Sequence, residues 1–312
     1  MIKWKPPVWQ QENNVSYLAL VFPALKERRL PFSRDQLMLL MAAINLLFLG
    51  LDTYLAHMIS GTLVPREQIP VYFGTIAGIV LLAAGLIALR NRGLAVWLAT
   101  LVLLSSTAVG LLGAYFHLIR GALPTAPAGQ RLSIDLLVWA PPIVAPLTFA
   151  LVGLWGLSAA WVEEPPDSGT LRLWRGRHLR LPYSKTRAYL FMVSLGLLAT
   201  LLSSVLDHAR SNFENPWLWI PTIAGIFGTV VAAGLGAVNK PTKGDIWVYI
   251  GTMLLLILVG LIGAALHIQF DLSGRNAIVT ERFLRGAPFL APLLFANMGT
   301  LGLIALLSPV ES

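Results

Sequence analysis

Four histidines stand at matched places in the chain and have the chemistry to hold a metal or a haem. His57 and His117 are 60 residues apart, and His208 and His267 are 59 residues apart. Zinc or copper usually takes three or four protein ligands, and the chain contains no cysteine that could complete such a set. A haem iron needs only two axial imidazoles. The pairs His57–His117 and His208–His267 therefore predict one or two molecules of haem b.

Glycine stands seven and four residues before the second histidine of each pair, at Gly110, Gly113, Gly260 and Gly263. On a helix these offsets share one face with the histidine, so the missing side chains could admit a flat macrocycle. The alternative is that these glycines let neighbouring helices pack closely within lipid.

Two arginines follow the histidines closely and could bind the carboxylates of a haem. Arg120 lies three residues beyond His117, and Arg210 lies two residues beyond His208. For any single histidine the alternative is an interfacial polar residue that bonds a carbonyl or a lipid headgroup. Recurrence of the histidines at matched positions favours a bound prosthetic group.

The composition indicates that these residues lie on membrane-spanning helices. Of the 312 residues, 56% are hydrophobic and only 12% are charged. Eight apolar runs are long enough to cross a bilayer, at about 36–58, 70–89, 94–118, 136–161, 188–208, 217–238, 246–268 and 284–307. Prolines in the fourth and eighth runs are expected to kink those helices. The net charge of +8 comes mostly from short loops beside these runs, so it does not indicate nucleic-acid binding.

The distribution of basic residues predicts the orientation of the chain. Sixteen Lys and Arg residues fall on the side of the N-terminus and seven fall on the opposite side. Both termini are therefore predicted to be cytoplasmic, in a membrane that is most simply the bacterial inner (plasma) membrane. All four histidines then lie near the outer face.

An internal duplication relates the first four runs to the last four. Four short stretches match in the same order, at offsets of 151, 147, 150 and 146 residues. The predicted fold is an all-α integral membrane protein with eight transmembrane helices in two tandem four-helix bundles. Its parts are an N-terminal cytoplasmic arm (1–34), a first repeat (35–161), a basic cytoplasmic linker (162–187) and a second repeat (188–308).

In plan, this arrangement of one histidine pair per four-helix repeat resembles haem A synthase over about residues 36–307. The resemblance implies two haem sites, one in each half, and oxidation of a haem methyl group. The family's glutamate-containing motif that ends in His-Arg is absent, since Met58 follows His57.

The first functional hypothesis is a cytochrome b-like membrane subunit that passes electrons between a quinol and a protein partner. A second is a structural or anchoring subunit without a redox centre, which binds lipid, a pigment such as chlorophyll, or neighbouring subunits. Haem modification of the haem A synthase type is a further alternative. The sequence does not decide whether the protein is an enzyme.

Overall fold

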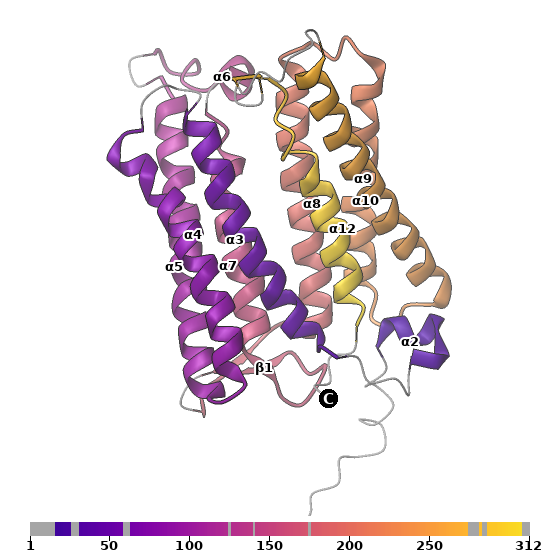
Figure 1. Cartoon of the computed structure of the whole chain (residues 1–312). Helices are drawn as coiled ribbons and strands as arrows, with labels where there is room; N and C mark the ends of the chain where they lie inside the picture. Colours follow the sequence, from indigo (N-terminus) through magenta and orange to yellow (C-terminus); the bar gives the residue numbers. More distant parts are fainter. Residues whose placement is uncertain are drawn as a thin grey trace, which may run out of the picture.

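Long helices standing side by side dominate the computed structural model (Figure 1). It describes residues 16–25, 31–58, 63–123, 126–139, 141–173, 176–273, 281–282 and 286–307. A first bundle contains α3 (Arg34–Met58), α4 (Pro65–Ala88), α5 (Arg92–Gly121) and α7 (Val144–Ala160), with the short α6 (Ile134–Trp139) at one end. A second bundle contains α8 (Lys185–Ala209), α9 (Trp219–Ala237) with the turn η3 (Pro216–Leu218) before it, α10 (Lys243–Leu272) and α12 (Leu293–Ala305).

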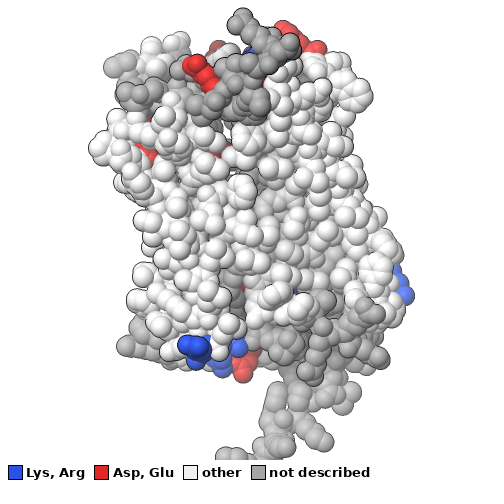
Figure 2. Space-filling model, in the orientation of Figure 1, with Lys and Arg blue, Asp and Glu red and all other residues white. Residues whose placement is uncertain are grey.

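Six of these helices are long and apolar enough to cross a membrane, namely α3, α4, α5, α8, α10 and α9 together with η3. Large apolar side chains cover their outer faces, where lipid chains would meet them. Figure 2 shows a broad zone with few charged side chains between the two ends of the molecule. The structure is therefore that of an integral membrane protein.

The fourth and eighth predicted runs contain shorter helices than expected. α7 has 17 residues and begins at Val144, and α12 has 13 residues and begins at Leu293. Proline lacks an N–H and cannot continue a helix from its preceding turn. Pro142 lies in the non-helical link before α7, and Pro292 is the N-cap of α12. The expected kinks are thus wrong, because these prolines mark where each helix begins.

The basic linker carries a small sheet that the sequence did not predict. Strands β1 (Val162–Glu163), β2 (Thr170–Arg172) and β3 (His178–Arg180) form an antiparallel sheet in the order β1-β2-β3. The buried carboxylate of Glu163 accepts backbone N–H groups of Asp167, Gly169 and Lys185 at 2.7–3.0 Å. This carboxylate therefore fixes the turn and joins it to the first residue of α8. The end of the molecule that carries the sheet is called the hairpin end below.

A buried ionic cluster at the hairpin end connects the two bundles. Lys185 of α8 is fully buried, and its ammonium bonds the carboxylate of Asp35 on α3 and the carbonyl of Trp161. The hydroxyl of Tyr189 donates to the same Asp35 carboxylate at 3.1 Å. Arg34 is 1% exposed and donates to Thr186 at 2.6 Å. These charges tolerate burial because they are paired and hydrogen-bonded.

Part of the predicted N-terminal arm packs on the second bundle. The short helix α2 (Tyr17–Val21) lies beside α10 and is followed by the turn η1 (Pro23–Leu25). The N–H of Leu18 donates to the carbonyl of Leu306 at 3.2 Å, and the Phe22 ring lies 5.2 Å from Trp247. Residues 1–15 and 26–30 of the arm lie outside the described residues.

Candidate functional site

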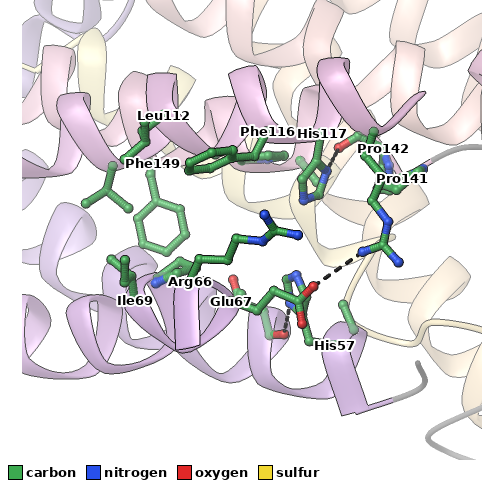
Figure 3. A pocket seen from close by; sticks show the side chains of 18 of the residues that line it. His57, Arg66, Glu67, Ile69, Leu112, Phe116, His117, Pro141, Pro142 and Phe149 are labelled. Atoms are coloured by element: carbon green, nitrogen blue, oxygen red, sulfur yellow. Dashed lines mark hydrogen bonds and ion pairs between the residues drawn. The ribbon is translucent and has the colours of Figure 1, made fainter. Parts of the chain in front are cut away.

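A cavity of about 880 Å³ opens in the first bundle, at the end opposite the sheet (Figure 3). This end, called the histidine end, holds the last turns of α3, α5 and α8 and the C-terminal part of α10. Its four histidines therefore share one end of the molecule. The deeper wall of the cavity is apolar, with Leu49, Val109, Leu112 and Phe149. Charged and imidazole side chains gather around its mouth.

The structure brings His57 and His117 together across this cavity. Their ring centroids are 6.2 Å apart, and the ring planes are inclined at 66°. His57 comes from the last turn of α3, and His117 comes from the last part of α5. Both side chains line the cavity.

Backbone carbonyls orient both rings. Nδ1 of His57 lies 2.8 Å from the carbonyl oxygen of Thr53, and Nδ1 of His117 lies 2.8 Å from that of Pro142. A carbonyl can only accept, so each Nδ1 carries the proton and the lone pair of the neutral ring is on Nε2. Metal-binding histidines are commonly held by the same kind of bond. Pro142 supplies this carbonyl because it lies in the link where the chain is not yet helical.

The N-terminus of α4 contributes two charged residues to the mouth. The carboxylate of Glu67 accepts the Val64 N–H at 3.2 Å and pairs with Arg120 of α5 at 3.3 Å. The guanidinium of Arg66 lies 5.8 Å from the centre of the Phe116 ring. Figure 3 shows the Arg66 side chain on the same side of the cavity as Phe116 and the two histidines.

Arg210 reaches this cavity from the second bundle. It caps the C-terminus of α8, and its Nε donates to the carbonyl of Val138 on α6 at 2.9 Å. It also lies 3.8 Å from the Asp207 carboxylate. Arg120 and Arg210, which follow histidines of different pairs in the sequence, thus line the same cavity.

The two glycines of the first bundle face α7. A Cβ on Gly110 would lie 2.3 Å from the backbone nitrogen of Ala150, and one on Gly113 would lie 2.8 Å from Pro146 Cβ. Both contacts are too short for a real Cβ atom. Gly110 therefore allows close packing of α5 against α7, the alternative that the sequence left open, while Gly113 also lines the cavity.

The glycines of the second bundle meet α12 in the same manner. A Cβ on Gly260 would lie 2.5 Å from the nitrogen of Ala296, and one on Gly263 would lie 2.9 Å from Pro292 Cβ. Gly260 and Gly263 therefore allow close packing of α10 against α12.

The second histidine pair has different surroundings. Nδ1 of His267 lies 3.1 Å from the carbonyl oxygen of Pro288, which resembles the contact between His117 and Pro142. The His208 ring contacts Phe213 at 6.0 Å, and its Nδ1 lies 3.4 Å from the Ser204 hydroxyl. His208 and His267 are near enough to interact electrostatically. Among the ring contacts of the described residues, His208 is paired with Phe213 and not with His267.

Sequence reasoning missed Arg66, Glu67 and Phe116 as site residues. Arg66 and Glu67 follow Pro65 immediately before an apolar run, a position that marks the first turn of a helix. That signal places the two charges at a helix start. It does not show that the helix start adjoins the two histidines.

The ligand types at the site restrict what it can bind. In the described part of the chain, no three His, Asp or Glu side chains come together as ligands for a bare metal ion. Two imidazoles beside a large cavity instead match the needs of a macrocycle that already supplies four ligands to its iron.

Comparison of the chain with family models, curated proteins and solved structures found no match. The resemblance to haem A synthase therefore stays a prediction.

Proposed function

We propose that the first bundle binds haem b through His57 and His117, and that the protein is a cytochrome b-like electron-transfer subunit. The observation that carries this proposal is the separation of the two rings, 6.2 Å between centroids. A metal–imidazole bond is about 2 Å long, and the nitrogen lies about 1 Å from its ring centre, so two opposed ligands require about 6 Å. The carbonyl bonds of both Nδ1 atoms favour the tautomer that such ligands need.

The shape and polarity of the cavity also fit haem. Its volume of about 880 Å³ lies within the usual range for cofactor pockets, about 300–1,000 Å³. Its apolar wall suits the macrocycle, and the arginines at its mouth suit the carboxylates. His57 and His117 would hold the iron, and Arg120 and Arg210 would hold the propionates. The bound haem would supply one-electron redox chemistry, while the protein orients it and restricts access of water.

Matched contacts in the two bundles support an origin by internal duplication, with eight membrane-crossing segments. Gly110 meets Ala150 as Gly260 meets Ala296, at offsets of 150 and 146 residues. The bonds of His117 and His267 to proline carbonyls repeat with the same offsets. In this proposal α7 and α12, each extended by the non-helical link before it, complete the two four-helix units.

The proposed electron path lies at the histidine end, which the distribution of charge predicts to be the outer face. A haem there lies too close to one surface to carry electrons across the whole membrane. We therefore propose a quinol as the donor, reached through the lipid, and a protein partner at the outer surface as the acceptor. The proposed membrane is the bacterial plasma membrane, with both termini cytoplasmic.

A visible absorption spectrum of the purified protein tests this function. Wild-type protein produced with ample haem should give a reduced-minus-oxidised spectrum of haem b. His57→Ala and His117→Ala should each abolish it. His178→Ala, which changes an exposed histidine of β3 at the hairpin end, should leave it unchanged. Colourless wild-type protein would contradict the proposal. A magnesium-containing pigment in the organic extract would show that the ligand is a chlorophyll and not haem.

A further inference from the structure

Three arginines surround the mouth of the cavity, and they differ in how their charge is compensated. Arg120 pairs with Glu67, and Arg210 lies beside Asp207. Among the described residues, no carboxylate lies within ion-pair distance of Arg66. Its contact is with the face of Phe116, at 5.8 Å. Arg66 therefore brings a positive charge into the cavity that an anionic ligand could neutralise.

The second bundle has aromatic residues where the first has two of these arginines. Arg66 follows Pro65 at the start of α4, and Trp217 follows Pro216 at the start of η3, the turn that leads into α9. The offset of 150 that relates His117 to His267 relates Arg120 to Phe270. The third arginine, Arg210, belongs to the second bundle but lines the cavity of the first.

The structure shows the surroundings of aromatic residues at this end of the second bundle. The Phe213 ring contacts His208 at 6.0 Å and stacks on Trp219 at 4.6 Å. Phe270 is 65% exposed on the surface of α10. This end of the second bundle thus carries aromatic side chains, namely Phe213, Trp217 and Phe270, whereas arginines gather around the first histidine pair.

We infer that the cavity of the first bundle selects a ligand that bears carboxylates, with Arg66 as a specificity-determining residue, and that the second bundle lacks this selectivity. The inference rests on the proposed haem site and names the part of the ligand that the protein recognises. A guanidinium over an exposed aromatic ring is weakly held. A charge-assisted bond to a carboxylate is stronger, so Arg66 exchanges Phe116 for the ligand's carboxylate when the ligand enters.

Titration of apoprotein with two forms of the ligand tests this inference. Apoprotein produced under haem limitation and placed in lipid nanodiscs is titrated with haem and with haem dimethyl ester, whose carboxylates are blocked. Wild-type protein should bind haem about tenfold or more tightly than the ester, the size expected when charge-assisted bonds are lost. Arg66→Gln should reduce this ratio by roughly tenfold, mainly through weaker binding of haem.

Arg90→Gln is the matched control, because Arg90 is an exposed arginine just beyond the opposite end of α4. The ratio of its affinities for haem and for haem dimethyl ester should equal that of wild type. Comparison of the haem-to-ester affinity ratio between variant and wild type cancels differences in solubility between the two ligands. Arg66→Lys, which keeps the charge but not the planar fork, should retain part of the discrimination.

Each failure has a distinct meaning. Wild-type apoprotein that binds neither form would contradict the proposed haem site itself. Equal affinity of the wild type for haem and ester would contradict carboxylate selection while leaving the haem site intact, and this arm needs no variant to fold. An unchanged ratio in folded Arg66→Gln would show that Arg66 is not the selecting residue.

Discussion

Glycines on α10 differ in what lies opposite them, and this difference decides how each would tolerate a side chain. A Cβ on Gly260 would come 2.5 Å from the backbone nitrogen of Ala296 on α12. A Cβ on Gly251 would meet no described atom within 4 Å. Backbone opposite Gly260 cannot move aside as a flexible side chain could. Residues of one type in one helix thus have separate roles.

We expect Gly260→Ala to destabilise the protein by about 1–3 kcal/mol, because overpacking forces α10 away from α12. Gly251→Ala should leave stability unchanged or raise it by up to about 1 kcal/mol, since alanine favours the helix. Thermal unfolding of both variants in the same detergent measures the difference. Equal melting temperatures would show that α10 and α12 are not in such close contact.

The amino-acid sequence predicted some site residues and missed others for a physical reason. The histidine pairs repeat with a fixed spacing, so a one-dimensional pattern reveals them. Arg66 was missed because it has no such spacing, and Arg210 was named only for its place beside His208, since the cavity that each side chain lines depends on the neighbouring helices. The glycine pattern was visible, but only the structure shows that α7 and α12 occupy the space beside it.

At the scale of elements, the joint between α3 and α8 depends on charged side chains that are buried or largely buried. Lys185 is 0% exposed, and the side chain of its partner Asp35 is 14% exposed. Removing one member of a buried ion pair leaves the other charge without compensation. Replacing both members with neutral groups avoids part of that cost, while the buried Arg34 loses its contact with Asp35.

Lys185→Met should therefore destabilise the protein by about 3 kcal/mol, because only the Arg34 guanidinium, at 3.3 Å, then remains to compensate the Asp35 carboxylate. The double variant with Asp35→Asn should recover part of this loss. Unfolding free energies of the wild type, both single variants and the double variant form a complete cycle. Strictly additive losses would show that the two side chains do not interact, and Lys243→Met, at the exposed start of α10, should have little effect.

Helix positions followed closely from the apolar runs. The run at 94–118 became α5 (Arg92–Gly121), and the run at 188–208 became α8 (Lys185–Ala209). Hydrophobic length is a strong signal for such helices. The starts of α7 and α12 were misplaced, because composition continues through the prolines while helical hydrogen bonding does not. The sheet β1-β2-β3 has strands of two or three residues, too short for an alternating pattern.

At the scale of the whole molecule, the two bundles share a plan but differ in the charge around their histidines. Arg66, Arg120 and Arg210 all serve the first cavity. Trp217 and Phe270 stand at the places in the second bundle that Arg66 and Arg120 hold in the first. The bundles are therefore expected to differ in cofactor content.

We expect one haem per chain. Iron and haem content, measured against protein by amino-acid analysis, should approach a ratio of one. His267→Ala should keep the haem spectrum that His117→Ala loses. A ratio of two, halved by either substitution, would show that the aromatic surroundings of the second pair also accept haem.

The absence of cysteine makes the predicted orientation directly measurable. A single cysteine at Asn91 lies in the exposed turn between α4 and α5, and one at Gln130 lies on the exposed surface at the other end. In intact cells, a membrane-impermeant maleimide should label the Gln130→Cys variant and not the Asn91→Cys variant. The reverse pattern would place the histidines on the cytoplasmic side.

The hydrogen bond from Leu18 to Leu306 joins a segment that the ribosome makes early to one that it makes late. Helix α2 emerges before either bundle, yet the surface that receives it includes α10 and the residue after α12. Helix α2 can therefore pack on this surface only after all the intervening helices have been inserted. Docking of α2 would thus be among the last steps of biogenesis, and a chain arrested before Leu306 would lack the carbonyl that α2 needs.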